Sequence, residues 1–406
     1  MALVLTATQG EPVSAQAPTT APLAEVAIDV SRLPTEVQAR AAAAAAEATA
    51  RYREWLGPPP LPSVSLTPRP WRGQASRQSN EVVLDVPWRD AEPSMDIESQ
   101  VAHGIARLWW PHLPADPAIE GIINGMAWYL QSRVVEDLFD RRFLKGAHSF
   151  DGVRLFGRAV PWTFQLLPLG RSTAGLGRAE FLNRDQRLPS ARRLPLDFSA
   201  ATARTALTFG TLERYVGWPA LQGSLRALAA PATPVLSSSE TLTRALSASL
   251  GQDVSWLFAQ ALDPVRHFDY ALQGFTSQSD GQPCAATPCF RTQVTVIRRG
   301  EALFTGTSAS PVGAFEAGDA MELAVEFSDG GVAFARWDGR GASRVFEFES
   351  STPAVVARLD PNRVLLLDAN YLDDVRRARS VSNVPIGKWV AQWLVWLQDA
   401  MLIYSF

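Results

Sequence analysis

The chain has 406 residues, of which 47% are hydrophobic and 13 are tryptophan. This composition suffices for sizeable cores and predicts a folded protein of two or three domains. The formal net charge is −3 at pH 7 and the sequence pI is about 5.9, so no basic surface is implied. Nucleic acid is therefore excluded as an expected partner.

The N-terminal part is expected to begin irregularly and to continue as a mixture of helix and strand. Residues 1–35 are rich in Pro, Ala and Thr, which predicts a disordered linker or the remnant of a signal sequence. Residues 41–55 start with an alanine run and stop before three prolines, which predicts a helix. Residues 63–68 and 81–86 alternate as strands do.

The pattern then changes from helices to strands. Helical spacing dominates residues 97–262, apart from a Pro- and Arg-rich break at 167–196. From 289 to 367, short alternating segments are separated by turn signals, and several strands at this spacing predict a β-sandwich. The clearest strand segments are 294–297, 321–327, 331–335, 345–348 and 355–357.

The C-terminal segment, residues 376–406, is predicted to be an amphipathic helix. Trp389, Trp393 and Trp396 fall on one face, while polar residues interrupt the apolar run, so a membrane-spanning helix is not expected. Two roles stay open: docking on the protein's own body, or contact with a membrane surface, which tryptophan-rich faces favour.

One helical segment carries a reduced version of a zinc-binding motif. In HExxH the two histidines share a helix face and grip one metal, while the glutamate between them activates water. Here the segment reads VAHGIARLWW, with His103 in the first position, Gly104 at the general base and Arg107 at the second histidine. A guanidinium has no lone pair to donate and repels a dication.

A second segment follows, and the interval from Arg107 to Asn124 is two residues shorter than the interval that precedes the third zinc ligand in proteins with this motif. It reads Asn124-Gly125-Met126-Ala127-Trp128-Tyr129. Together, the two segments resemble VxHExxHQWWG and NEGxAxY of the aminopeptidase N family of gluzincins, with Asn124 at the ligand glutamate. The resemblance implies an α+β fold: a thermolysin-like peptidase domain at 36–275, a β-sandwich at 276–375 and the helix at 376–406.

Two further family landmarks are also altered. Active relatives carry YxKG, whose tyrosine supports the oxyanion, and Thr202 stands at that tyrosine here. The stretch matching the amine-binding GxMEN loop, residues 73–80, contains no carboxylate. The resemblance therefore implies a zinc metallopeptidase fold, while the substituted positions predict no catalysis and no bound cofactor.

The leading hypothesis is a pseudopeptidase that binds peptides or a partner protein in a groove lined by His103, Arg107 and Asn124. In this interpretation Gly104 and Thr202 are degenerate catalytic positions, and adding Gly104→Glu to restored ligands is expected to recover weak hydrolysis. A structural envelope component is a further alternative, and so is an ordinary buried helix with a core histidine.

The main rival is an active zinc peptidase with a relocated metal site. The side chains available for such a site are His112, His148, Glu98, Glu136 and Asp137. None of the histidine pairs has the i, i+4 spacing that places two imidazoles on one helix face.

Cys284 and Cys289, the two cysteines of the chain, enclose four residues in a Gly- and Pro-containing loop. This spacing predicts a small disulfide if the compartment is oxidising, with two free thiols as the alternative. Residues 2–7 and 15–17 resemble the end of a secretory signal. Both features favour an extracytoplasmic location.

Overall fold

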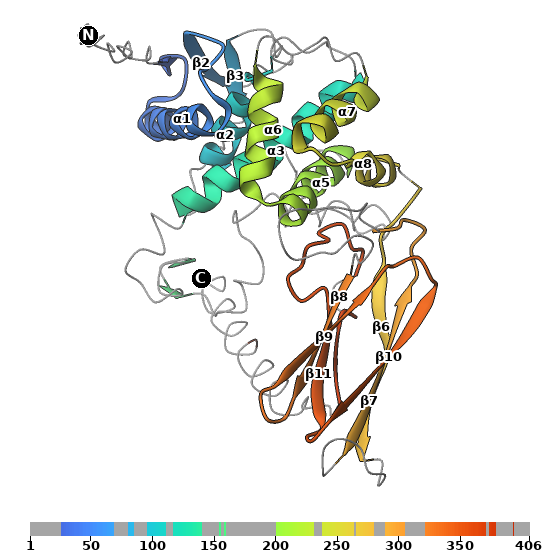
Figure 1. Ribbon diagram of the computed structural model, residues 1–406. Coiled ribbons are helices and arrows are strands. Elements are labelled where there is room, and N and C mark those ends of the chain that lie inside the picture. The colour runs from blue at the N-terminus through green and yellow to red at the C-terminus, as the bar shows by residue number, and fades with distance from the viewer. Residues whose placement is uncertain are drawn as a thin grey trace, which may run out of the picture.

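The computed structural model forms a helical region that carries a small sheet and a region of two larger sheets (Figure 1). Its described residues are 26–68, 80–84, 96–110, 117–139, 154–155, 158–159, 200–230, 238–263, 265–279, 289–304, 321–370, 373–378 and 393.

Three parallel strands open the helical region. They are β1 (Ala27–Asp29), β2 (Ser63–Pro68) and β3 (Glu81–Leu84), in the order β1-β2-β3. The sequence predicted β2 as it stands and β3 from its first residue, while residues 85 and 86 of that prediction lie outside the described part of the chain. The predicted linker is wrong at residues 27–29, because Ala27 pairs with Ser63 in the sheet. Its residues 1–25 lie outside the described part of the chain.

Helix α1 (Thr35–Leu56) covers this sheet and packs along α2 (Asp96–Arg107). The alanine face of α1 is buried, which lets the two helices approach closely. Buried Tyr52 donates its hydroxyl to the Ala102 carbonyl at 3.0 Å. Arg40 of α1 grips Glu98 of α2 through two hydrogen bonds of 2.7 Å, so the buried charge of Glu98 is compensated.

The remaining helices complete a compact bundle. Helix α3 (Pro117–Phe139) packs against α2 and α5 (Ala200–Val216). A β-carbon added at Gly125 of α3 would lie 2.3 Å from Thr205 Cβ of α5, so glycine permits this contact. The other helices here are α6 (Trp218–Ala229), α7 (Ser239–Leu250) and α8 (Ser255–Ala261). The strands β4 (Arg154–Leu155) and β5 (Arg158–Ala159) form a separate antiparallel pair.

Two antiparallel sheets form the second region, in the orders β10-β7-β6 and β12-β11-β8-β9. Strand β11 contacts both β6 and β7, so the sheets face each other, as expected for a β-sandwich. Alternate residues such as Leu323 and Val325 are fully buried between them. The strands are β6 (Tyr270–Ser279), β7 (Phe290–Arg298), β8 (Met321–Phe327), β9 (Val332–Trp337), β10 (Ser343–Ser350), β11 (Ala354–Leu359) and β12 (Val375–Arg377). All five predicted strand segments lie in these strands or within one residue of them.

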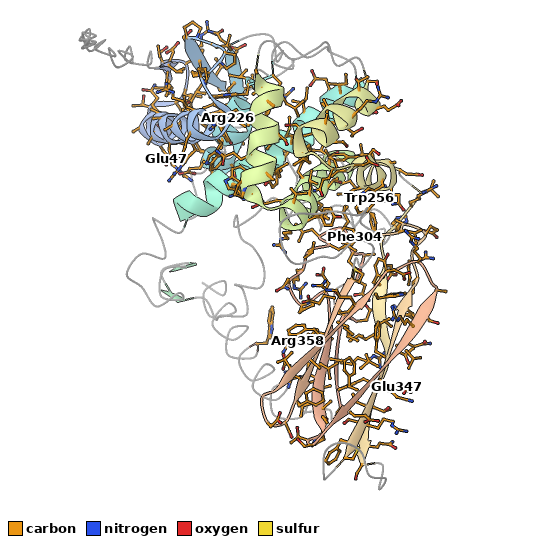
Figure 2. The ribbon with its side chains drawn as sticks, viewed as in Figure 1. Glu47, Arg226, Trp256, Phe304, Glu347 and Arg358 are labelled. Carbon is orange, nitrogen blue, oxygen red and sulfur yellow. The ribbon has the colours of Figure 1, made fainter. Side chains whose placement is uncertain are left out.

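The helical region rests on the sheets through aromatic and hydrogen-bonded contacts. Trp256 of α8 meets Phe304 edge to face, with ring centroids 5.5 Å apart (Figure 2). Tyr215 of α5 makes a similar contact with Phe304 at 5.9 Å. The Leu366 amide donates to Thr211 Oγ1 at 3.1 Å, which anchors the loop after β11 to α5. These contacts attach the C-terminal half of α5 to the region of the two larger sheets.

Cys289 is disulfide-bonded, while its predicted partner Cys284 lies outside the described residues. Of the predicted C-terminal helix, the structure describes residues 376–378 and Trp393; Arg376 and Arg377 belong to β12 instead. Among the helices described, none has the length and apolarity needed to cross a membrane.

A buried carboxyl group lies where the loop after β11 returns to β12. Asp374 is only 7% exposed. Burial, and then the neighbouring Asp368, Asp360 and Asp373, raises the pKa of Asp374 from 3.8 to about 8, while Arg363 acts in the opposite direction. Asp374 is therefore protonated in the folded protein at neutral pH.

Asp374→Asn is expected to stabilise the protein more at pH 8 than at pH 5. The unfolded carboxyl loses its proton near pH 3.8, whereas the folded one keeps it up to about pH 8, so wild-type stability falls as pH rises between these values. Asparagine removes this loss. Urea unfolding at both pH values measures it, with exposed Glu301→Gln as the control. An equal effect of Asp374→Asn at both pH values would contradict the expectation.

Candidate functional site

Three helices bring the sequence-predicted residues together. Helix α2 carries His103 and Arg107 one turn apart, and α5 carries Thr202 in its first turn. Helix α3 contributes Glu120, Asn124 and Trp128, which lie at four-residue intervals and therefore on one face. We define the His103 site as His103, Arg107, Glu120, Asn124, Trp128 and Thr202.

A chain of hydrogen bonds runs through the site. His103 Nε2 lies 2.8 Å from Asn124 Oδ1, and Asn124 Nδ2 donates to Thr202 Oγ1 at 3.3 Å. Because an amide oxygen only accepts, Nε2 of His103 must carry the proton. In the neutral ring, the lone pair is then on Nδ1, and the nitrogen facing Asn124 cannot bind a metal.

The imidazole of His103 is buried and held neutral. His103 is 7% exposed and stacks on Trp128, with ring centroids 4.4 Å apart and an interplanar angle of 26°. Burial, followed by the nearby positive charge of Arg107, lowers the pKa of His103 from 6.5 to about 3. The hydrogen bond with Asn124 opposes this shift but does not overcome it.

Arg107 is the least satisfied charge in the site. Its side chain is 23% exposed, and its Nη2 lies 3.6 Å from Glu120 Oε2, which is beyond hydrogen-bond distance. Its Nε is buried and has no hydrogen-bond partner among the described residues. The Nε–H donor of the guanidinium is therefore unpaired within the described part of the chain.

Gly104 serves packing. A β-carbon at this position would lie 2.2 Å from Cγ1 of Val82, a buried residue of β3. Helix α2 therefore lies directly on the sheet, and no room exists for a longer side chain. The expectation that Gly104→Glu, added to restored ligands, recovers weak hydrolysis stays a prediction, and it requires Val82 to shift.

The residues present do not fit a zinc ion at this position. They offer one imidazole whose inward nitrogen is protonated, a neutral amide in place of a carboxylate, and a guanidinium in place of the second imidazole. No catalytic step through a metal is derived for this site.

The relocated metal site finds no support in the described residues. Glu98 is held by Arg40 in a bidentate pair, in which each of its oxygens accepts a hydrogen bond. His112, His148 and the side chains of Glu136 and Asp137 lie outside the described residues. Within the described ranges, no three His, Cys, Asp or Glu side chains converge as metal ligands do.

Sequence reasoning missed two members of the site, Glu120 and Trp128. Both lie four residues from Asn124 on α3, so the helical period places all three on one face. That period was the available signal in the sequence.

Residues 73–79 of the stretch compared with GxMEN lie outside the described part of the chain. Asn80, its last residue, donates its Nδ2 to Ser63 Oγ at 3.3 Å.

No protein-family model and no curated protein matches the chain. Solved structures that resemble it include Legionella pneumophila aminopeptidase A in complex with aspartic acid, at 12% identity and TM-score 0.49, covering 85% of this chain and 36% of that one. Another is an M1 zinc metallopeptidase from Deinococcus radiodurans, at 19% identity and TM-score 0.34, covering 57% and 45%. A third is a two-domain M1 zinc metallopeptidase bound to L-arginine, at 19% identity and TM-score 0.34, covering 57% of this chain and 44% of that one.

The chain thus spans less than half the length of these solved proteins. They are zinc peptidases or aminopeptidases by description, and the likeness concerns fold alone. Because identities are below 20% and TM-scores below 0.5, activity is not transferred from them to this chain.

His103→Gln is expected to make the protein less sensitive to acid. The unfolded imidazole takes up a proton near pH 6.5, whereas the folded one resists it down to about pH 3, so wild-type stability is lost as pH falls through this window. The loss is about 1.4 kcal/mol per pH unit at most. Unfolding free energies at pH 7, 6 and 5 measure it. Parallel curves for variant and wild type would contradict the prediction.

Proposed function

We propose that the chain is a non-catalytic, gluzincin-like protein that binds peptides or a partner protein at the His103 site. The observation that carries the proposal is the hydrogen-bonded chain from His103 through Asn124 to Thr202. It uses the positions that the aminopeptidase resemblance assigns to zinc ligands and to the catalytic tyrosine. At each of them the chemistry of hydrolysis is replaced by a packed hydrogen bond.

Binding is supported by what the site retains. Arg107 and Glu120 are both partly exposed, so the site has an open polar edge next to its buried imidazole. Arg107 can place two parallel donors against a carboxylate, and this geometry is suited to peptide recognition. The thermolysin-like arrangement of the peptidase domain belongs to the same proposal.

The proposed location is extracytoplasmic. The disulfide at Cys289 supports an oxidising compartment, because reduced thiols prevail in the cytosol. Contact with a membrane surface through residues 389–400 is the associated proposal for the C-terminal segment. Its tryptophans are suited to the interface between water and lipid.

Purified protein is expected to contain no stoichiometric zinc and to cleave no aminopeptidase or endopeptidase substrate in a chelator-sensitive manner. Elemental analysis and a substrate panel measure these two properties. One zinc per chain, lost when His103 is replaced by Gln, would refute the proposal and favour an active metallopeptidase.

Arg107→His combined with Asn124→Glu is expected to create measurable zinc affinity without hydrolysis. The pair restores two ligands beside His103, but Gly104 supplies no general base. Calorimetry with zinc tests binding, and Arg244→His, at an exposed helical arginine paired with Glu240, is the matched control.

Adding Gly104→Glu to this double variant is expected to reduce stability, because the new side chain meets Val82. Combining it with Val82→Ala is expected to relieve the closest contact, that with Cγ1 of Val82. If the variant with only Arg107→His and Asn124→Glu folds but has no zinc affinity, these helices do not correspond to a metallopeptidase site.

A further inference from the structure

The buried and half-buried arginines of the helical region differ in how their donors are satisfied. Arg40 makes two 2.7 Å hydrogen bonds to Glu98. Arg204 donates to two main-chain carbonyls near the end of α8, those of Asp263 and Arg266. Both side chains therefore have a structural task that occupies the guanidinium fork.

Arg133 is satisfied in a different way. It donates to Glu213 and lies over the ring of Trp218, with the guanidinium carbon 3.7 Å from the ring centroid. Its Nε has no hydrogen-bond partner among the described residues, as in Arg107, but its Nη1 donates to Glu213 and its flat face covers Trp218. Cation–π contacts of this kind stabilise a partly buried guanidinium.

Arg107 has no comparable arrangement among the described residues. Its ion pair with Glu120 is 3.6 Å long, and its buried Nε has no hydrogen-bond partner among the described residues. A largely covered cation with a buried unpaired donor carries an unfavourable desolvation cost. An anion that accepts two of its donors would remove most of that cost.

The neighbourhood favours an anion over a cation or a neutral group. His103 is uncharged, so it does not compete for the anion. Burial, and after it the positive charge of Arg107, lowers the pKa of His103. Glu120 is the one described carboxylate paired with Arg107, and its distance leaves the fork open.

We propose that the Arg107 guanidinium is the receptor for a carboxylate group of a bound peptide, with Glu120 as an intramolecular competitor that the ligand displaces. This inference rests on the proposed function, because it names the ligand group recognised at the same site. The carboxylate can come from the C-terminus of a peptide or from an acidic side chain, and the two sources are separated by the probes below.

Three probes are compared on the full chain: the tripeptide Ala-Ala-Ala with a free C-terminus, its C-terminal amide, and N-acetyl-aspartate amide. Binding is followed by the imidazole nitrogen signals of protein labelled at histidine. The chain has four histidines, so the His103 signal is assigned with His103→Gln. At least one carboxylate-bearing probe is expected to shift this signal saturably. The C-terminal amide of the tripeptide, which has no carboxylate, is expected to leave the signal unchanged. The probe that binds identifies the source.

Two variants test the roles of the charged pair. Arg107→Gln is expected to weaken the binding probe by about tenfold or more, because charge-assisted hydrogen bonds are lost. Glu120→Gln is expected to strengthen it several-fold, because the competitor becomes neutral. Arg244→Gln, at an exposed arginine that also pairs with a glutamate, is the control and should leave binding unchanged. Thermal unfolding verifies that each variant is folded.

Equal binding of the free tripeptide and its C-terminal amide would overturn the carboxylate assignment. It would not contradict the proposed binding of peptides. Absence of binding by all three probes at millimolar concentration would also overturn it. The separate finding of stoichiometric zinc or chelator-sensitive hydrolysis would instead refute the non-catalytic function, so the two failures are distinguishable. If Arg107→Gln proves unstable, a Glu120→Gln protein with unchanged affinity overturns the inference by itself.

Discussion

The hydrogen bond between His103 and Asn124 is the contact on which the arrangement of the helical region depends. It joins α2 to α3 in an interior where an unpaired polar atom is costly, and the same amide continues to Thr202 of α5. One asparagine thus ties three helices. The bond also fixes the ring as a neutral tautomer, so the interior requires no buried positive charge at this point.

Close approach of the helices makes this bond feasible, and two glycines provide that approach. Gly104 lets α2 lie against Val82 of the sheet, and Gly125 lets α3 lie against Thr205 of α5. A β-carbon at either position would push its helix away, and a 2.8 Å bond tolerates little displacement. The substitution that reads in the sequence as the loss of a general base is therefore part of the packing.

Local periodicity explains which features the sequence could predict. His103 and Arg107 share a face by spacing alone, and alternation located the five strand segments of the sheets. Pairings between distant segments could not be read in this way. Ala27 joins Ser63 across α1, and Arg40 finds Glu98 across 58 positions, because both depend on how elements assemble. Glu120 is intermediate: its helix face was predictable, but its pairing with Arg107 was not.

Charge completes the picture of how this interior is organised. Glu98 accepts hydrogen bonds from Arg40, and Glu213 accepts one from Arg133. Each of these pairs cross-links two helices. Arg107 also bridges two helices through Glu120, but without a hydrogen bond and with part of its side chain in solvent. Pairs that only stabilise a fold gain from short bonds and exclusion of water, whereas a receptor for an anion must leave its donors accessible. The loose pair next to the neutral imidazole meets the second requirement, and this accessibility is what the proposed carboxylate receptor needs.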